Sequence, residues 1–137
     1  MSIMDNKALV RTYMERAFVQ HDLDAASELI GEHYCLHDPT RPDFSGGRES
    51  FKAIHKVYLN GIRDHSFTIN EQVAEGDRVA TRWTVTGCQM KDLPGIPNKG
   101  ECFKIGGITM SRVSDGHIVE EWQDWDNSGL ARQLGTS

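Results

Sequence analysis

Apolar residues follow a helical period in the first half of the chain and a strand-like period in the second half. Near the N-terminus they recur at offsets that place them on one side of a helix. We expect this helix to run from Asp5, as its cap, to about Gln20. The apolar stripe consists of Leu9, Val10, Tyr13, Met14, Ala17 and Phe18.

A second, shorter helix is predicted from Leu23 to Ile30. Gly31 follows it, in the position where a glycine often ends a helix in the left-handed conformation. Residues 33–39 are predicted to be extended, because Pro39 disfavours helix at the residue before it.

A third helix is predicted over about residues 48–62, with an apolar side formed by Phe51, Ile54, Val57, Tyr58 and Ile62. After Asp64 the sequence becomes rich in Thr, Val, Ile and Trp, with turns between the apolar segments. This pattern is typical of β-strands. The predicted strands span residues 65–75, 78–90, 101–113 and 117–125.

In the third of these strands the apolar positions change parity between Ile105 and Ile108. The pair Gly106-Gly107 lies at the change, and we therefore predict a glycine β-bulge there. Residues 91–100, between the second and third strands, hold two of the four prolines and are expected to form a loop.

A last short helix is predicted from about Asn127, with Asp126 as its cap. Helices followed by a run of antiparallel strands indicate an α+β fold, and we expect one domain over residues 1–137.

The composition is that of a globular domain, with 38% hydrophobic and 26% charged residues. No apolar run approaches the roughly 20 residues of a membrane span, and the first ten residues lack the apolar core of a signal peptide. A net charge of −5 argues against nucleic-acid binding. The three cysteines, Cys35, Cys88 and Cys102, show no metal-binding spacing, so we expect reduced thiols in a cytoplasmic protein.

Several familiar catalytic motifs are absent from the sequence. There is no G-x-S-x-G elbow, no Walker loop and no G-x-G-x-x-G after a strand. The six histidines lack the spacing of a zinc enzyme. The neighbouring pair His37-Asp38 is weak support for a metal site, and we expect no metal.

The segment of residues 116–130 combines four carboxylates and two tryptophans with a strand-like pattern. Alternate residues of a strand face opposite sides. One face would carry Val119, Glu121, Gln123 and Trp125, and the other Ile118, Glu120, Trp122, Asp124 and Asp126. Each face has a tryptophan and an acid, so the pattern leaves open which face is inside.

Two interpretations of these carboxylates remain. They form a solvated face, as charges on strands usually do, or one of them enters an apolar cavity, where desolvation raises its pKa and suits it to acid/base chemistry. Arg82, next to Trp83, has a similar ambiguity between a cross-strand ion pair and substrate contact. His37 and Asp38 precede a proline turn, where Asp38 either forms an Asx-type turn or belongs with His37 to a polar pair at the pocket mouth.

Taken together, the chain resembles the SnoaL-like polyketide cyclases of the nuclear-transport-factor-2-like superfamily. The resemblance covers nearly the whole chain in order and spacing. It is carried by HDPT (37–40), AEGDRVATRWTVTG (74–87), LPGIPNKG (93–100) and ITMSRVSDGHIVEEWQDWDNSGLARQLG (108–135).

The resemblance implies a cone-shaped α+β barrel, in which a curved, mainly antiparallel sheet wraps around the N-terminal helices and encloses a deep apolar pocket. It also implies a homodimer formed through the outer face of the sheet. The best-understood members close a ring of an aromatic polyketide by intramolecular aldol condensation, without metal or cofactor. The expected partner is thus a small apolar or aromatic ligand, and we expect binding to neither nucleic acid nor membrane.

The cyclases' catalytic aspartate on the final strand falls on Gln123 in an ungapped alignment, and a one-residue bulge would bring Asp124 into its place. Their histidine on the preceding strand falls on Thr109. We therefore expect Asp124 to be the acid/base group, with His37 and Asp38 as further catalytic residues. The expected substrate-binding residues are Gln123, Trp122, Trp125, Arg82, Trp83, Thr109, Tyr58 and Met110.

Three functions are compatible with the sequence. The first is a cyclase-like lyase or isomerase using aldol-type chemistry on an apolar carbonyl compound. The second is another enzyme in the same pocket, such as a steroid-type isomerase, a dehydratase or an epoxide hydrolase. The third is a non-enzymatic small-molecule-binding protein, because a widespread fold does not fix function.

Overall fold

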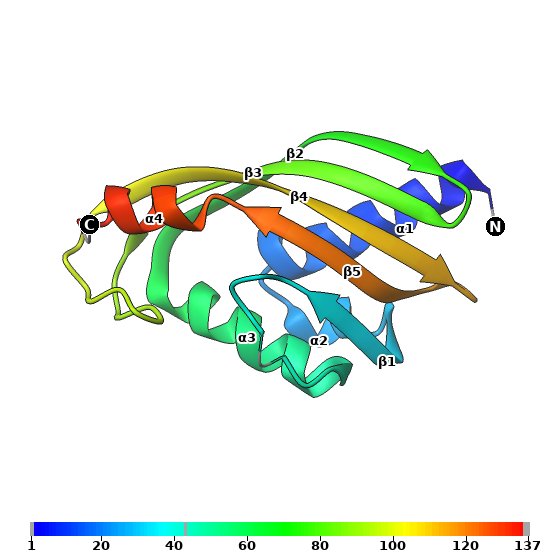
Figure 1. The fold of residues 1–137 in the computed structure, drawn as a ribbon, viewed down its shortest axis with the longest axis horizontal. Helices are drawn as coiled ribbons and strands as arrows, with labels where there is room; N and C mark the ends of the chain where they lie inside the picture. Colours follow the sequence, from blue (N-terminus) through cyan, green and yellow to red (C-terminus); the bar gives the residue numbers. More distant parts are fainter. Residues whose placement is uncertain (1, 43, 136–137) are drawn as a thin grey trace.

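The structure is a computed structural model that describes residues 2–42 and 44–135. It has the expected α+β architecture: a curved five-stranded sheet packs against helices, and the sheet remains open (Figure 1). In chain order the elements are α1 (Ile3–Met14), the π-helical η1 (Glu15–Val19), α2 (Leu23–Ser27), β1 (Ile30–His37), α3 (Gly47–Gly61), β2 (Ile62–Glu75), β3 (Arg78–Gln89), β4 (Cys102–Ser114), β5 (His117–Trp125) and α4 (Asn127–Gln133).

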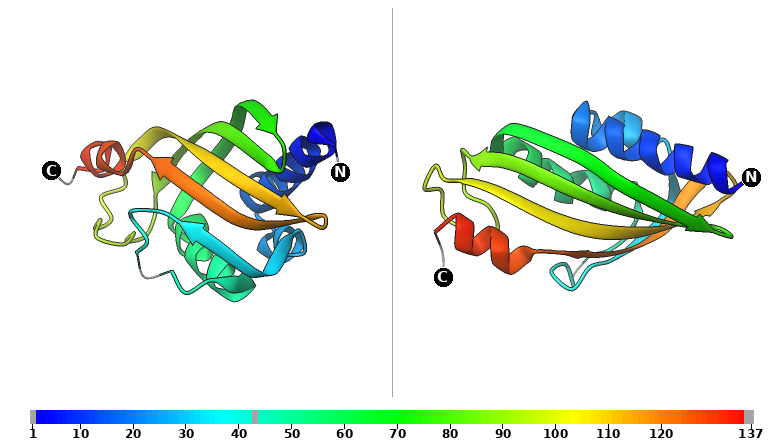
Figure 2. Two further views of the ribbon diagram at one scale, coloured as in Figure 1. Left: turned by 45° about the vertical axis from the view of Figure 1, so that its right-hand side comes forward. Right: turned by 90° about the horizontal axis from the view of Figure 1, so that it is seen from above.

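The strand order in the sheet is β1-β5-β4-β3-β2. The pairs β2–β3, β3–β4 and β4–β5 are antiparallel, whereas β1 pairs parallel with β5. Strands β1 and β2 are the two edges of the sheet. Helices α1, α2 and α3 lie on one side of the sheet (Figure 2). None of the helices in the described ranges is long and apolar enough to span a membrane.

The predicted helices are present, with corrections at their ends. Ser2, and not Asp5, caps α1: the Ser2 hydroxyl accepts from the Asp5 N–H, and the Asp5 carboxylate accepts from the Ser2 N–H. This reciprocal pair is a capping box. Asp126 caps α4 as predicted, because its carboxylate accepts from the Gly129 N–H at 2.8 Å.

Gly31 does not end a helix, because α2 stops at Ser27 and Gly31 belongs to β1. A Cβ atom at Gly31 would lie only 3.0 Å from Cγ1 of Val119. Glycine is thus used here for the close approach of β1 to β5.

The predicted bulge at Gly106-Gly107 is also wrong, because the β3–β4 register runs through both glycines without interruption. The strand keeps strict alternation, and Ile108 and Met110 face outward, with 52% and 37% of their surface exposed. Gly107 has a different role: a Cβ atom there would approach the Trp83 ring to 2.5 Å. The glycine lets the indole lie across β4.

A bulge does occur in β5. Arg112 pairs with Glu120 and Val113 with Ile118, so Val119 is one extra residue on the β5 side. Because a bulge reverses the alternation of side chains, Ile118 faces the core before it and Glu121 faces the core after it.

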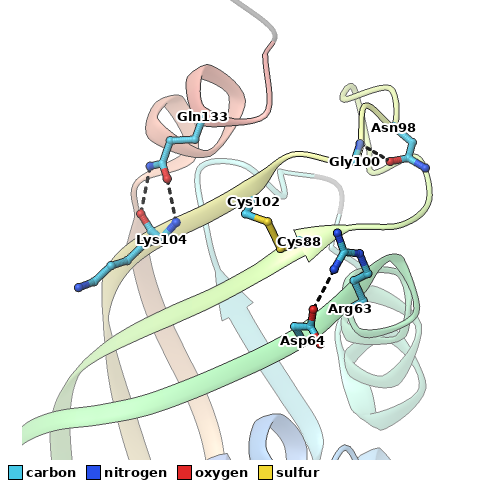
Figure 3. The surroundings of a disulfide bond; sticks show 8 residues. All are labelled: Arg63, Asp64, Cys88, Asn98, Gly100, Cys102, Lys104 and Gln133. Atoms are coloured by element: carbon cyan, nitrogen blue, oxygen red, sulfur yellow. Dashed lines mark hydrogen bonds and ion pairs between the residues drawn. A yellow bond between two sulfur atoms is a disulfide. The ribbon is translucent and has the colours of Figure 1, made fainter.

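The expectation of three reduced thiols is wrong for two of them. Cys88 of β3 and Cys102 of β4 lie opposite each other in the register and form a disulfide (Figure 3). The bond joins the two strands at the neck of the loop 89–101. Cys35 is free.

The buried carboxylate of Glu121 is the main polar feature of the core, with only 2% of its surface exposed. Oε1 accepts hydrogen bonds from the hydroxyls of Tyr13 at 2.9 Å and Tyr34 at 2.6 Å, and Oε2 accepts from Ser111 at 2.6 Å. Burial raises the pKa of Glu121, and the three hydroxyls partly oppose this rise. The carboxylate thereby links α1, β1, β4 and β5.

We expect Glu121→Leu to destabilise the protein by about 3–5 kcal/mol, because three buried hydroxyls would lose their acceptor. Glu121→Gln keeps one oxygen that can accept from both tyrosines, and it should cost markedly less. Urea unfolding followed by tryptophan fluorescence measures both. Equal losses for the two variants would contradict the proposed role of these hydrogen bonds.

Candidate active site

A largely apolar cavity of about 130 Å³ lies between the inner face of the sheet, the end of α1 with η1, and α3. Aromatic rings form much of its wall, among them Phe18, Phe67, Trp83, Phe103 and Trp125. Its polar lining residues are Tyr13, Asp38, Arg41, His55, Tyr58, His65, Thr109 and Gln123.

A chain of hydrogen bonds crosses the inner face of the sheet beside this cavity. Trp83 Nε1 donates to Thr109 Oγ1 at 3.0 Å, and the Thr109 hydroxyl donates to Gln123 Oε1 at 3.0 Å. Gln123 Nε2 then donates to Asp38 Oδ2 at 3.1 Å. An indole N–H can only donate and a carboxylate can only accept, so the direction of the chain is fixed at both ends.

Asp38 is held by four donors and has only 7% of its surface exposed. Oδ2 also accepts from Trp125 Nε1 at 3.1 Å, while Oδ1 accepts from the backbone N–H and the hydroxyl of Thr40, both at 2.8 Å. Of the two alternatives that the sequence left open for Asp38, the structure shows the Asx-type turn. Asp38 also lines the cavity, so the turn fixes the orientation of its side chain there.

His55 also lines the cavity, although it is not among the site residues expected from the sequence. It lies on α3 one turn after Phe51, and its ring packs 4.6 Å from that of Phe51 and 5.1 Å from that of Phe18, measured between centroids. Burial, assisted by the positive charge of Arg41 and opposed by Asp38, lowers the pKa of His55 to about 4. The imidazole is thus neutral near pH 7. Its spacing to Phe51 and Tyr58 on one helix face was the available signal.

A second histidine reaches the cavity from β2. His65 Nδ1 lies 3.0 Å from Nε2 of His21, which has a positive φ of 56° in the turn after η1. Burial and the neighbouring His21 lower the pKa of His65 to about 4. Both cavity histidines are therefore uncharged near neutral pH.

The expected acid/base residue, Asp124, does not enter the cavity. Its side chain lies exposed on the outer face of the sheet, and Gln123 faces inward in its place. The reason is the alternation after the bulge in β5, which places Glu121, Gln123 and Trp125 on the inner face.

Four other expected site residues also face outward: Arg82, His37, Trp122 and Met110. Arg82 forms the cross-strand ion pair that was the alternative to substrate contact, with Glu71 at 2.7 Å. His37 stacks on Trp122, with centroids 5.4 Å apart, and its Nε2 lies 2.7 Å from Oε2 of Glu120. Met110 lies beside Trp122 in the register.

The cavity does bring together more than half of the expected site residues. They are Asp38, Tyr58, Trp83, Thr109, Gln123 and Trp125. Across the described ranges, no three His, Cys, Asp or Glu side chains are arranged to hold a metal ion.

Comparison with known proteins places these features in context. The family model for SnoaL-like polyketide cyclase matches residues 8–134. TsrD from Streptomyces laurentii is 27% identical with a TM-score of 0.89, and the match covers 100% of this chain and 99% of TsrD. IdmH from Streptomyces antibioticus, a candidate polyketide cyclase, is 30% identical with a TM-score of 0.80, covering 96% of this chain and 99% of IdmH.

A third structure, AclR from Streptomyces galilaeus, a candidate hydroxylase, shares the fold at 24% identity and a TM-score of 0.84, with 98% of each chain covered. Among curated proteins none matches the chain.

The lowered pKa of His55 predicts a stability loss in acid. Unfolded His55 binds a proton below its ordinary pKa of 6.5, whereas the folded form does so only near 4. Folding stability should therefore fall as the pH drops from 7 to 5, and His55→Leu should remove about 2 kcal/mol of that fall.

Urea unfolding at the two pH values measures this difference. His33→Leu, at an exposed position of β1, is the matched control for the loss of an imidazole. A His55→Leu variant with the wild-type pH dependence would show that the ring is not held neutral.

Proposed function

Because the chain belongs to the SnoaL-like polyketide cyclase family, we propose that it performs cofactor-independent acid/base chemistry on an apolar carbonyl compound bound in the cavity. The family match and the cyclase-like neighbours support a cyclase-like function. The aromatic walls suit a flat ligand, and the cavity is close in size to one that holds a single aromatic ring.

One observation carries the assignment of the acid/base group. Asp38 is the one carboxylate among the cavity-lining residues of the described chain. It contacts Gln123, which falls on the cyclases' aspartate in the ungapped alignment, and Gln123 in turn contacts Thr109, which falls on their histidine in the same alignment. We assign to Asp38 the role that the sequence suggested for Asp124.

In the proposed reaction, the Asp38 carboxylate takes a proton from the carbon next to the substrate carbonyl. The C–H electron pair moves into the enolate, which then closes the ring by attacking a second carbonyl group, and Asp38 returns the proton to the new alkoxide. All acceptor positions of Asp38 are occupied in the free protein. The Gln123 amide would turn to the substrate oxygen, freeing one of them and stabilising the enolate.

A second candidate function is ligand binding without turnover. It is favoured by the four hydrogen bonds that Asp38 already accepts, and by the amide of Gln123, which falls on the family's aspartate in the ungapped alignment. In this case the polar chain serves to orient the carbonyl group of a ligand.

Asp38→Asn should lower the rate of acid/base catalysis at least about 100-fold, since the base is removed while the shape is kept. Exchange of the protons next to the carbonyl of indan-1-one into D₂O, followed by NMR, measures this without knowledge of the natural substrate. Asp124→Asn, which changes the same charge on the outer face, should retain the wild-type rate.

Two results would count against the catalytic proposal. Equal rates for Asp38→Asn and wild type would exclude Asp38 as the base. Saturable binding of indan-1-one by wild type, detected by tryptophan fluorescence, with no exchange above the buffer rate would favour the binding protein.

We also propose a homodimer formed through the outer face of the sheet. Val73, Ala80, Met110 and Trp122 follow one another across β2, β3, β4 and β5 in the register, and Val73 and Met110 are exposed apolar side chains. Exposed apolar rows of this kind mark interaction surfaces, and a two-fold axis would cover the row with its own copy.

Met110→Glu should convert this dimer to a monomer, because the new charge would face its own copy across the axis. Sedimentation velocity measures the change. Val57→Glu, at an exposed position on α3, is the control and should remain dimeric. A monomeric wild-type protein at micromolar concentration would contradict the proposal.

A further inference from the structure

The guanidinium of Arg41 lies in the aromatic wall of the cavity. Its central carbon is 4.7 Å from the centroid of the Tyr58 ring, and the Tyr58 ring meets that of Trp125 edge-on at 6.4 Å. Arg41, Tyr58 and Trp125 all line the cavity. A cation is thus fixed against the face of one of the rings that a flat ligand would contact.

Arg41 has no carboxylate within ion-pair distance and no hydrogen-bond acceptor for its side chain among residues 2–42 and 44–135. Most other arginines of the chain are paired on the surface. These are Arg11, Arg16, Arg63, Arg78, Arg82 and Arg112. Among the described residues, Arg41 therefore differs from them in two ways: it lines the cavity, and it forms no ion pair.

The charged side chains around the cavity differ in the hydrogen-bond and ion-pair partners that they have. The carboxylate of Asp38 already accepts from Gln123, Trp125 and Thr40. His55 is neutral near pH 7, and the charge of Arg41 is one cause of this, so the field of the guanidinium reaches into the cavity. Within residues 2–42 and 44–135, the charge beside the cavity that lacks an ion-pair partner is positive. A half-buried cation gains most from an anion with matching hydrogen-bond geometry.

We propose that Arg41, stacked on Tyr58, is an anion-recognition site that selects flat ligands bearing a carboxylate or an ionised enol oxygen. A carboxylate matches the planar guanidinium with two parallel hydrogen bonds, while its ring lies against the aromatic wall. The inference rests on the proposed use of the cavity as a ligand site, and it adds the charge class of the ligand. In a cyclisation, Arg41 would bind the enolate oxygen that forms when Asp38 takes a proton.

The test compares three probes of one size: benzoate, benzyl alcohol and benzylammonium. Their binding to the wild-type protein is measured by titration calorimetry at neutral pH. Benzoate should bind at least about tenfold more tightly than benzyl alcohol, and benzylammonium more weakly than either.

Arg41→Gln should abolish the preference for benzoate, and Arg41→Lys should retain only part of it, because lysine lacks the planar fork. Arg82→Gln removes the same charge from the outer face and should keep the wild-type preference. Equal affinities of wild type for benzoate and benzyl alcohol would overturn the proposal, as would a benzoate preference that survives in Arg41→Gln.

Binding of the probes is independent of turnover, so the two proposals fail separately. Selective benzoate binding without indan-1-one exchange would leave the anion site standing and remove the catalytic role of Asp38. Exchange without benzoate selectivity would remove the anion site alone.

Discussion

The extra residue in β5, Val119, decides which side chains of that strand enter the protein. After this bulge, Glu121, Gln123 and Trp125 face inward, and Asp124 faces outward. These inward side chains make the main polar contacts of the core. Glu121 accepts hydrogen bonds from α1, β1 and β4, and Gln123 and Trp125 both donate to Asp38. A shift by one residue would exchange these faces and place charged side chains in the core.

The two buried carboxylates, Glu121 and Asp38, accept hydrogen bonds from protein groups in place of water. Glu121 receives three hydroxyls and Asp38 receives an indole, an amide and both donors of Thr40. Hydrogen bonds of this number offset the free-energy cost of removing a carboxylate from water. Arg41 is the contrast, because its guanidinium lies over the Tyr58 ring and forms no ion pair within residues 2–42 and 44–135.

The sequence predicted the helices and strands well, because each has a clear period, and the resemblance supplied the curved sheet. It could not predict the inward face of β5, since both faces carry a tryptophan and an acid, and the bulge has no glycine to mark it. Apolar Ile108 and Met110 suggested a bulge in β4, although they lie on the outer surface. His55 and Arg41 were missed because their importance comes from neighbours distant in the chain, which no local pattern records.

The disulfide between Cys88 and Cys102 has a consequence for the way the molecule opens. It closes the loop whose Leu93 and Ile96 pack under the cavity wall against Phe103 and Leu130. Thermal fluctuations that fray the sheet cannot separate these strand ends while the link is intact. Local opening of the sheet is therefore disfavoured at the end where β3 leaves the sheet and β4 enters it.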